Sequence, residues 1–451
     1  MSRLFGTDGV RGVANLELTP ELAFRIGRAG AIVLHDGADA QQPIVVGRDT
    51  RVSGSMLEAA IVAGITSAGR NALLLGIVPT PAVASVARRT GAAAGVMISA
   101  SHNPVADNGI KFFSGDGFKL SDELELEIER TVVADDVPRP TGTEVGVVRS
   151  AFNLGRHYYE ELYEGVPSLE GLEVIVDAGF GAAYAIAPYV MRKLGARVVE
   201  LNCDADGSRI NVACGTTDLR HLRETVRSRI ADGAGRVVGV AFDGDADRAL
   251  FVDETAETVS GDHVMFAMAR DMHERGELAR DTVVATVMSN IGFERALARH
   301  GIALVRTAVG DRYVLEAMRE GGYTLGGEQS GHLLDFRYNN TGDGPRTAMT
   351  LLGIVAARQT RLCELVSEVQ IAPQILVNVT SRDRGVLALD SVQDEIAQAQ
   401  AALGGTGRLL IRPSGTEPLI RVMAEGENLQ LIEEIAGRVA ARIELELSRL
   451  P

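Results

Sequence analysis

The fold class is decided by residues 237–248, Val-Val-Gly-Val-Ala-Phe-Asp-Gly-Asp-Ala-Asp-Arg, where a short apolar run ends in an acidic turn. Six apolar residues bounded by turn residues predict a buried β-strand. Two further apolar runs, 44–46 and 174–176, also end directly in turns that contain Gly and Asp. Segments with helical periodicity separate these strands, so the chain is predicted to form βαβ units with helices on both faces of each sheet.

The α/β pattern occurs three times along the 451 residues and is then replaced by a different one. We predict three similar α/β/α sandwich domains over residues 1–150, 151–254 and 255–370. Residues 371–451 predict three strands and two helices with a partly antiparallel sheet, which is a smaller α+β domain. A chain about three times as long as a ~150-residue domain has room for three or four cores.

The composition excludes several classes of protein. A formal net charge of −15, with 4% aromatic residues and no Trp, argues against nucleic-acid binding, which needs a clustered basic face. No apolar run is long enough to span a membrane, and the first residues lack a signal-peptide pattern, so we expect neither a membrane nor secretion. Three cysteines without a CxxC pair predict no disulfide framework or zinc site, and a cytoplasmic location follows.

A Ser-rich turn follows the strand predicted at 94–99, in residues 98–104, Ile-Ser-Ala-Ser-His-Asn-Pro. Such a turn places a Ser hydroxyl at the carboxyl end of a sheet, where α/β proteins bind their ligands. Ser101 is therefore a candidate nucleophile. Adjacent residues rarely form a nucleophile–base pair, so we expect no hydrolytic triad with His102. A polar turn that satisfies its own backbone explains the same residues.

Three carboxylates follow the strand 237–242 at alternate positions, Asp243, Asp245 and Asp247. Their repulsion at close range predicts a divalent cation, and hard oxygen ligands favour Mg²⁺, with one ion per subunit. The spacing also fits the start of an EF-hand loop. Arg248 stands where that loop needs Gly, and the flanking segments are strand-like, so we reject an EF-hand. A solvated acidic turn is the alternative.

Two Gly-containing loops are candidate substrate-binding segments. The first, Gly-Gly-Glu-Gln-Ser-Gly-His at 326–332, offers Glu328 and Ser330 to a sugar diol, although an ordinary loop has the same composition. The second, Arg-Pro-Ser-Gly-Thr-Glu-Pro at 412–418, offers backbone N–H groups, hydroxyls and guanidinium groups to a phosphate. Its candidate ligands are Arg412, Ser414, Gly415, Thr416 and Arg421, and a tight turn between strands is the alternative.

Lysine is scarce: the chain has three, Lys111, Lys119 and Lys193, and its other positive residues are Arg. Lys111 is therefore a candidate for a role that Arg cannot fill, because a buried Lys can lose its proton. The alternative is that Lys111 is a lysine by chance, has no special role and lies on a solvent-exposed strand.

These motifs occur together, and in this order, in the α-D-phosphohexomutase superfamily, which the chain resembles from residue 5 to about residue 426. The opening Phe-Gly-Thr-Asp-Gly-Val-Arg-Gly at 5–12 belongs to the same pattern. Within the superfamily the chain is similar to the branch of bacterial phosphoglucosamine mutases. Gly-Gly-Glu-Gln-Ser-Gly-His, Val-Gly-Asp-Arg-Tyr-Val at 309–314 and Thr-Gly-Asp-Gly at 341–344 carry that closer similarity.

The resemblance implies four domains around a central cleft. It also implies interconversion of glucosamine 6-phosphate and glucosamine 1-phosphate through a bisphosphorylated sugar, feeding UDP-N-acetylglucosamine and cell-wall synthesis. Ser101 would be the phosphoserine and would hold Mg²⁺ together with the three Asp residues. Glu328 and Ser330 would bind sugar hydroxyls, and the 412–421 loop would bind the distal phosphate. Lys111, Arg11 and His102 would assist proton transfer and stabilise charge, and Arg248 and His332 would line the cleft.

Other functions stay open on the sequence alone. The resemblance also allows a phosphomannomutase or phosphoglucomutase, and a homodimer is a family-level expectation. A non-catalytic, Mg²⁺-dependent sugar-phosphate binding protein would need no nucleophile, so Ser101 argues against it. A phosphatase that uses Asp243 as nucleophile would fit the Asp-x-Asp spacing.

Overall fold

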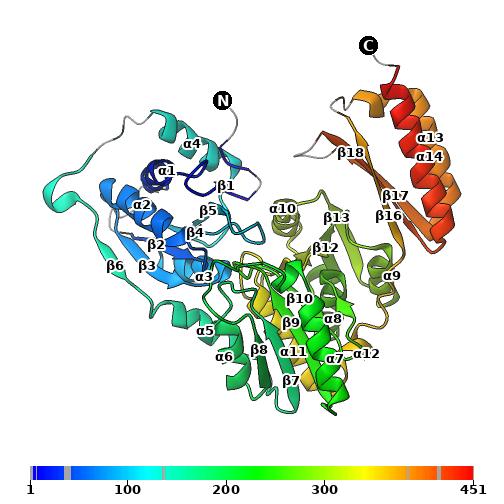
Figure 1. Ribbon diagram of the computed structural model, residues 1–451, viewed down its shortest axis with the longest axis horizontal. Coiled ribbons are helices and arrows are strands. Elements are labelled where there is room, and N and C mark those ends of the chain that lie inside the picture. The colour runs from blue at the N-terminus through cyan, green and yellow to red at the C-terminus, as the bar shows by residue number, and fades with distance from the viewer. Residues whose placement is uncertain are drawn as a thin grey trace.

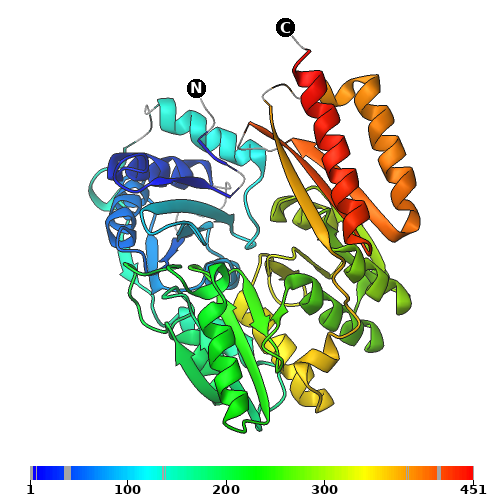
Figure 2. The same cartoon turned by 45° about the vertical axis from the view of Figure 1, so that its right-hand side comes forward.

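The structure is a computed structural model that describes residues 4–6, 8–34, 42–134, 137, 139–381, 383, 385–413 and 418–449. It contains four sheets, each belonging to one domain. The domains follow one another around an arc, with the first and fourth at its two ends (Figures 1 and 2). Among the described residues, no helix combines the length and the apolar character needed to cross a bilayer.

The first domain has a six-stranded sheet of order β1-β5-β4-β2-β3-β6, in which β1 and β5 run antiparallel to their neighbours. Alternate residues of β2 point to opposite faces: Val45 packs in one cluster, and Ile44 and Val46 pack in another with α1, α2 and α4. The strands are β1 (Val10–Val13), β2 (Ile44–Arg48), β3 (Ala72–Ile77), β4 (Ala94–Ile98), β5 (Asp107–Ser114) and β6 (Val148–Ser150). The helices are α1 (Pro20–Val33), α2 (Gly54–Ser67), α3 (Thr80–Thr90) and α4 (Asp122–Ala134).

The second domain has a five-stranded sheet of order β11-β10-β9-β7-β8, with a parallel centre and an antiparallel hairpin at one edge. The predicted strand at 237–242 is confirmed as its central strand β9, buried on both faces. The strands are β7 (Leu172–Asp177), β8 (Arg197–Leu201), β9 (Arg236–Phe242), β10 (Ala249–Val252) and β11 (Thr258–Val259). The helices are α5 (Gly155–Tyr163), α6 (Ile186–Lys193) and α7 (Arg220–Ala231).

The third domain has a four-stranded sheet of order β13-β12-β14-β15, which positions two loops of the candidate site. The strands β14 and β15 form an antiparallel pair around the Glu328–Gly331 turn. The strands are β12 (Thr282–Thr286), β13 (Ala303–Thr307), β14 (Leu325–Gly327) and β15 (Leu333–Asp335). The helices are α8 (Gly261–Glu274), α9 (Ile291–Arg299), α10 (Asp311–Gly321), α11 (Gly344–Arg358) and α12 (Leu362–Leu365).

The fourth domain breaks the α/β pattern, as the sequence predicts. Its antiparallel sheet, of order β16-β18-β17, packs against two helices, and an apolar core separate from that of the other domains lies between them. By contrast, one continuous core extends through the first three domains. The strands are β16 (Gln374–Thr380), β17 (Gly407–Pro413) and β18 (Leu419–Gly426), and the helices are α13 (Asp390–Leu403) and α14 (Leu429–Leu447).

Candidate active site

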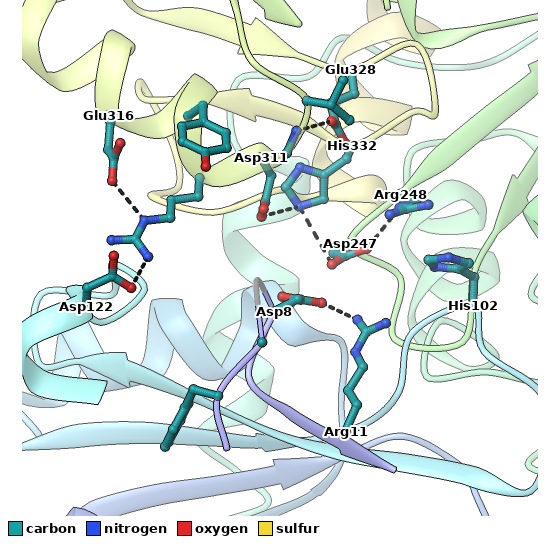
Figure 3. A pocket seen from close by; sticks show the side chains of 16 residues that line it. Asp8, Arg11, His102, Asp122, Asp247, Arg248, Asp311, Glu316, Glu328 and His332 are labelled. Atoms are coloured by element: carbon teal, nitrogen blue, oxygen red, sulfur yellow. Dashed lines mark hydrogen bonds and ion pairs between the residues drawn. The ribbon is translucent and has the colours of Figure 1, made fainter. Parts of the chain in front are cut away.

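A cavity of about 620 Å³ lies where loops of the first three domains meet (Figure 3). Charged side chains dominate its wall. The lining residues are Phe5, Gly6, Asp8, Arg11, His102 and Asp122 from the first domain, Asp247 and Arg248 from the second, and Val309, Gly310, Asp311, Arg312, Tyr313, Glu316, Glu328 and His332 from the third.

Ser101 lies directly after β4, buried beside this cavity, with a left-handed backbone at φ 51°. Its N–H donates to Ser99 Oγ (2.9 Å), and its hydroxyl donates to Asp243 Oδ2 (2.6 Å). Ser101 Oγ is also 3.1 Å from His102 Nδ1. The side chains of these two chain neighbours are therefore in contact. The tight turn at Ser101 lets adjacent side chains meet.

The three carboxylates of the 243–247 turn converge as a candidate metal centre. Asp243, Asp245 and Asp247 are buried and offer oxygen atoms that lie within 4.8 Å of one another. A solvated acidic turn is therefore excluded. Asp245 Oδ1 and Asp247 Oδ1 have no hydrogen-bond partner within the protein. Burial and the adjacent Asp247 and Asp245 raise the pKa of Asp243 well above its ordinary value. The set has the hard, uncompensated oxygen donors that Mg²⁺ prefers.

Lys111 faces the carboxylate cluster from β5. Its Nζ lies 2.9 Å from Asp8 Oδ2, 3.2 Å from Asp245 Oδ2 and 3.5 Å from Asp247 Oδ2. It is 2% exposed, so the alternative of a solvated strand position is wrong. Burial opposes its charge, but Asp245, Asp8 and Asp247 outweigh burial and raise the pKa of Lys111. Burial by itself would raise the pKa of Asp245, but the charge of Lys111 outweighs burial and lowers that pKa to about 2. Lys111 is thus a cation in this arrangement.

Arg11 and His102 enter the cavity from the first domain. Arg11 pairs with Asp8 and donates to Asn103 Oδ1 (3.2 Å), so it lies beside the Ser101 loop. Partial burial and the positive charges of Arg248 and Arg11 lower the pKa of His102 to about 4. His102 is therefore neutral near pH 7.

An isolated antiparallel bridge pairs Arg248 with His332 and so joins the end of the 243–247 turn to the third domain. Both residues line the cavity. Arg248 Nε is 3.9 Å from Asp247 Oδ1, and His332 Nε2 is 3.7 Å from Asp247 Oδ2 and 3.6 Å from Asp311 Oδ2 (Figure 3). The second and third domains therefore present adjacent side chains to one ligand space.

Glu328 lines the cavity at the turn between β14 and β15. Its Oε1 accepts the N–H of Gly310 (3.2 Å), and its Oε2 accepts the hydroxyl of Ser330 (3.4 Å). The carboxylate is thus oriented by two loops of the third domain. This leaves it with the acceptor capacity that recognition of a diol requires.

The 412–421 loop belongs to the fourth domain, and none of its described residues, 412–413 and 418–421, lines the cavity. Arg412 and Arg421 are direct partners across β17 and β18. Burial and the neighbouring Arg421 lower the pKa of Arg412, which indicates a site that favours an anion. Ser414, Gly415 and Thr416 lie outside the described residues.

The sequence did not single out an ionic network in the wall of the cavity. Asp8 contacts Arg11, Lys111 and Lys119, and Lys119 also pairs with Asp311 at the start of α10. A second pair, Arg312 Nη1 to Asp122 Oδ1 (2.5 Å), joins the same two domains. The scarcity of Lys was the signal for Lys119. Asp8, Asp311 and Arg312 lay in quoted motifs without an assigned role.

Sequence models of four consecutive domains match this chain. They are phosphoglucomutase/phosphomannomutase α/β/α domain I at residues 2–138, domain II at 156–257, domain III at 260–371 and the C-terminal domain at 375–442. The chain belongs to the phosphoglucomutase/phosphomannomutase family. The predicted membership of the phosphohexomutases and the predicted four-domain fold are therefore confirmed.

Relatives within this family are similar over their whole length. A phosphoglucosamine mutase of Symbiobacterium thermophilum is 51% identical over 451 residues, covering 99% of this chain and 100% of that protein. A phosphoglucosamine mutase of Heliobacterium modesticaldum is 50% identical, covering 98% and 99%.

Solved structures of phosphoglucomutase/phosphomannomutase proteins share the fold. A family protein from Burkholderia thailandensis superposes with a TM-score of 0.84 at 24% identity, covering 99% of this chain and 98% of that one. An N-acetylphosphoglucosamine mutase of Aspergillus fumigatus, solved with GlcNAc-6P and magnesium, gives a TM-score of 0.66 at 17% identity, covering 98% and 95%.

Proposed function

We propose that this protein is a phosphoglucosamine mutase that interconverts glucosamine 6-phosphate and glucosamine 1-phosphate. The observation that carries the proposal is the 2.6 Å hydrogen bond from Ser101 Oγ to Asp243, which places a nucleophile against three buried carboxylates beside a large charged cavity. The curated relatives at about 50% identity bear the same activity in their names.

Asp243, Asp245 and Asp247, together with a phosphate on Ser101, would hold one Mg²⁺. Two of these carboxylates each have an oxygen without a partner in the protein, which supports this assignment. When bound, the ion would neutralise the negative charge that gathers on the transferring phosphoryl group. Lys111 and Arg11 lie on the same side and supply further positive charge.

The reaction consists of two phosphoryl transfers in opposite directions. In the first, the P–Oγ bond of phosphorylated Ser101 breaks, and a bond forms from phosphorus to the free 1- or 6-oxygen of the substrate. The sugar hydroxyl gives up its proton as Ser101 Oγ leaves and takes one up, and His102, whose Nδ1 lies 3.1 Å from Ser101 Oγ, would relay the proton between them. The resulting bisphosphorylated sugar turns over, and its other phosphate returns to Ser101 Oγ, which restores the phosphoserine enzyme.

Each end of the sugar must be held in turn while the other reacts. Glu328 and Ser330 would bind hydroxyl groups of the ring. Arg412 and Arg421, with Ser414, Gly415 and Thr416, would bind the phosphate that is not reacting. Because the arginine pair lies outside the cavity, the fourth domain would close on the substrate and exclude water from the phosphoserine.

A substrate panel tests the proposal. Glucosamine, glucose and mannose 6-phosphates are compared by kcat/KM, while free phosphate is measured in parallel. The highest kcat/KM for glucosamine phosphate without net phosphate release is the expected result. A preference for glucose or mannose phosphate would make the chain a sister mutase. Stoichiometric phosphate release would make it a phosphatase, and binding without turnover would make it a binding protein.

Three further proposals accompany the activity. We propose a cytoplasmic location, supported by the unpaired cysteine pattern, and a homodimer, which sedimentation in solution would test. We also retain the domain divisions near residues 150, 254 and 370, which limited proteolysis would examine.

A further inference from the structure

Arg51 is a fully buried arginine that the proposed mechanism does not use. It lies between β2 and α2, in the turn that follows Gly47, and its side chain has no exposure to solvent. A buried guanidinium group is costly unless each of its donors is satisfied, so the identity of its acceptors indicates its role.

All five guanidinium N–H donors of Arg51 have acceptors. Nε donates to Asp49 Oδ2 (3.1 Å). Nη1 donates to the carbonyl oxygens of Pro104 (2.6 Å) and Asp107 (2.9 Å), and Nη2 donates to those of Ser101 (3.0 Å) and Asn103 (2.8 Å). Four of the five bonds therefore go to main-chain carbonyls of one segment, residues 101–107, which carries the nucleophile.

Asp49 extends this arrangement to the other side of Ser101. Its Oδ1 accepts the N–H of Arg51 (2.8 Å), and its Oδ2 accepts the hydroxyl of Ser99 (2.6 Å). Ser99 Oγ in turn accepts the N–H of Ser101. The Asp49–Arg51 pair thus fixes both main-chain polar groups of Ser101. Asp49 fixes the amide through Ser99, and Arg51 binds the carbonyl directly.

The second domain fixes the same carbonyl. Asn211 Nδ2 donates to the carbonyl oxygens of Ser101 (2.8 Å) and Asn103 (3.4 Å). A Cβ at Gly244 would lie 2.5 Å from the carbonyl oxygen of Ser101, so the 243–247 turn packs directly against that oxygen. Ser101 has a left-handed φ of 51°, an unfavourable conformation for a residue with a side chain that persists only when its surroundings enforce it.

We propose that Arg51 is a positioning residue for phosphoryl transfer, which holds the 101–107 segment so that Ser101 Oγ points at Asp243. The inference rests on the proposed mutase activity. Lys in its place keeps a positive charge for Asp49 but lacks the planar fork needed to bind four carbonyls. A nucleophile displaced by about 1 Å loses roughly 100-fold in rate, whereas binding of the sugar elsewhere in the cleft is unaffected.

The test compares Arg51→Lys with Arg346→Lys in the full-length enzyme. Arg346 is a matched control because it is also buried and donates to two main-chain carbonyls, those of Glu161 (2.9 Å) and Glu164 (3.2 Å), in contacts unrelated to the Ser101 segment. We expect R51K to lower kcat by roughly 100-fold with KM within a few-fold of wild type, and R346K to change neither. An R51K enzyme with wild-type kcat would overturn the proposal.

Chemical rescue separates positioning from simple stabilisation. In Arg51→Ala, millimolar guanidinium chloride should restore part of kcat by occupying the vacated site, and sodium chloride should not. Guanidinium weakens folding in general, so restored activity would not follow if Arg51 only stabilised the domain. A folded R51A that guanidinium fails to rescue contradicts the proposal.

Asn211→Ala covers the case in which neither Arg51 variant folds, because it removes the other donor to the Ser101 carbonyl without opening the first domain's core. Lowered kcat with unchanged KM then supports the positioning role. If neither Arg51 variant folds and N211A has the kcat of wild type, the positioning role is refuted. An inactive wild-type protein would instead refute the proposed function.

Discussion

The hydroxyl of Ser101 donates a 2.6 Å hydrogen bond to Asp243, a residue 142 positions away in another domain. The nucleophile comes from the end of β4 and the carboxylate from the end of β9. The reactive centre therefore exists only where the carboxyl edges of two separate sheets meet. Substitutions in the first domain should affect the nucleophile, and those in the second should affect the carboxylates.

Replacement of Ser101 by Ala should abolish mutase turnover, because no oxygen remains to carry the phosphoryl group. We expect activity at least ~10³-fold below wild type, since removal of a covalent nucleophile commonly costs this much or more. The measurement is conversion of glucosamine 6-phosphate, with intact-mass detection of a phosphate on the wild-type protein. Ser228→Ala, on the exposed surface of α7, is the control. Turnover by S101A would rule out the phosphoserine scheme.

Replacement of Asp243 by Asn should remove metal binding without loss of metal-free stability. Burial raises the pKa of Asp243, and repulsion from the carboxylates of Asp247 and Asp245 raises it further. Asn at position 243 carries no charge and relieves that repulsion. In wild type, Mg²⁺ at 100 times its Kd should add about 2.7 kcal/mol to the free energy of unfolding. Thermal melts with and without Mg²⁺ measure both effects, with exposed Asp204→Asn as control. Equal stabilisation of D243N by Mg²⁺ would place the metal elsewhere.

His102 should titrate well below an ordinary histidine. Partial burial and the charges of Arg248 and Arg11 lower its pKa from 6.5 to about 4. The stability that depends on its neutral form is therefore complete above pH 6.5 and is lost as the pH falls toward 4. Imidazole NMR signals of the metal-free enzyme measure the titration, with exposed His157 as an internal reference. Arg248→Gln should move the His102 midpoint upward, and an unmoved midpoint would exclude Arg248 as a cause.

Replacement of Arg421 by Ala should weaken substrate capture but not folding. Arg412 and Arg421 lie directly opposite each other, and like charges in that register are unfavourable in the absence of an anion. Loss of one charged hydrogen bond to phosphate, about 1.5–3 kcal/mol, corresponds to a ~10- to 100-fold decrease in kcat/KM. Steady-state kinetics and thermal melts provide the comparison. Unchanged kcat/KM would remove this pair from the phosphate site.

Cys203 and Cys214 should react slowly with thiolate-directed reagents at pH 8. Burial raises the pKa of each thiol from 9.0 to about 12, so only a small fraction of either is ionised. We expect alkylation at least ~100-fold slower than in the urea-unfolded protein, because the thiolate is the reactive form. Peptide mapping after timed labelling measures both rates. Equal rates in the folded and unfolded protein would contradict the burial.

The sequence predicted the elements whose patterns are local. The apolar run before Asp243 is β9, which is buried on both faces. The acidic triad was also predictable, because three carboxylates at alternate positions after a strand cannot avoid one another. The loss of the α/β pattern after about residue 370 indicated the fourth domain.

Contacts between distant segments could not be predicted in this way. Nothing local to Arg51 indicates that its guanidinium binds carbonyls more than fifty residues away. The pairing of Lys119 with Asp311 likewise depends on how two domains dock. The strands β14 and β15 have only three residues each, and two of the residues in β14 are glycines, so neither strand has a sequence pattern long enough to predict it.

The distribution of lysine has a practical consequence for handling the protein. Lys111 is buried and Lys119 is half-buried, each in an ion pair with Asp8, whereas Lys193 is exposed at the end of α6. Amine-directed labels, tethers and surface couplings will therefore use a single side chain, on the second domain. Coupling through lysine will consequently attach the enzyme by its second domain.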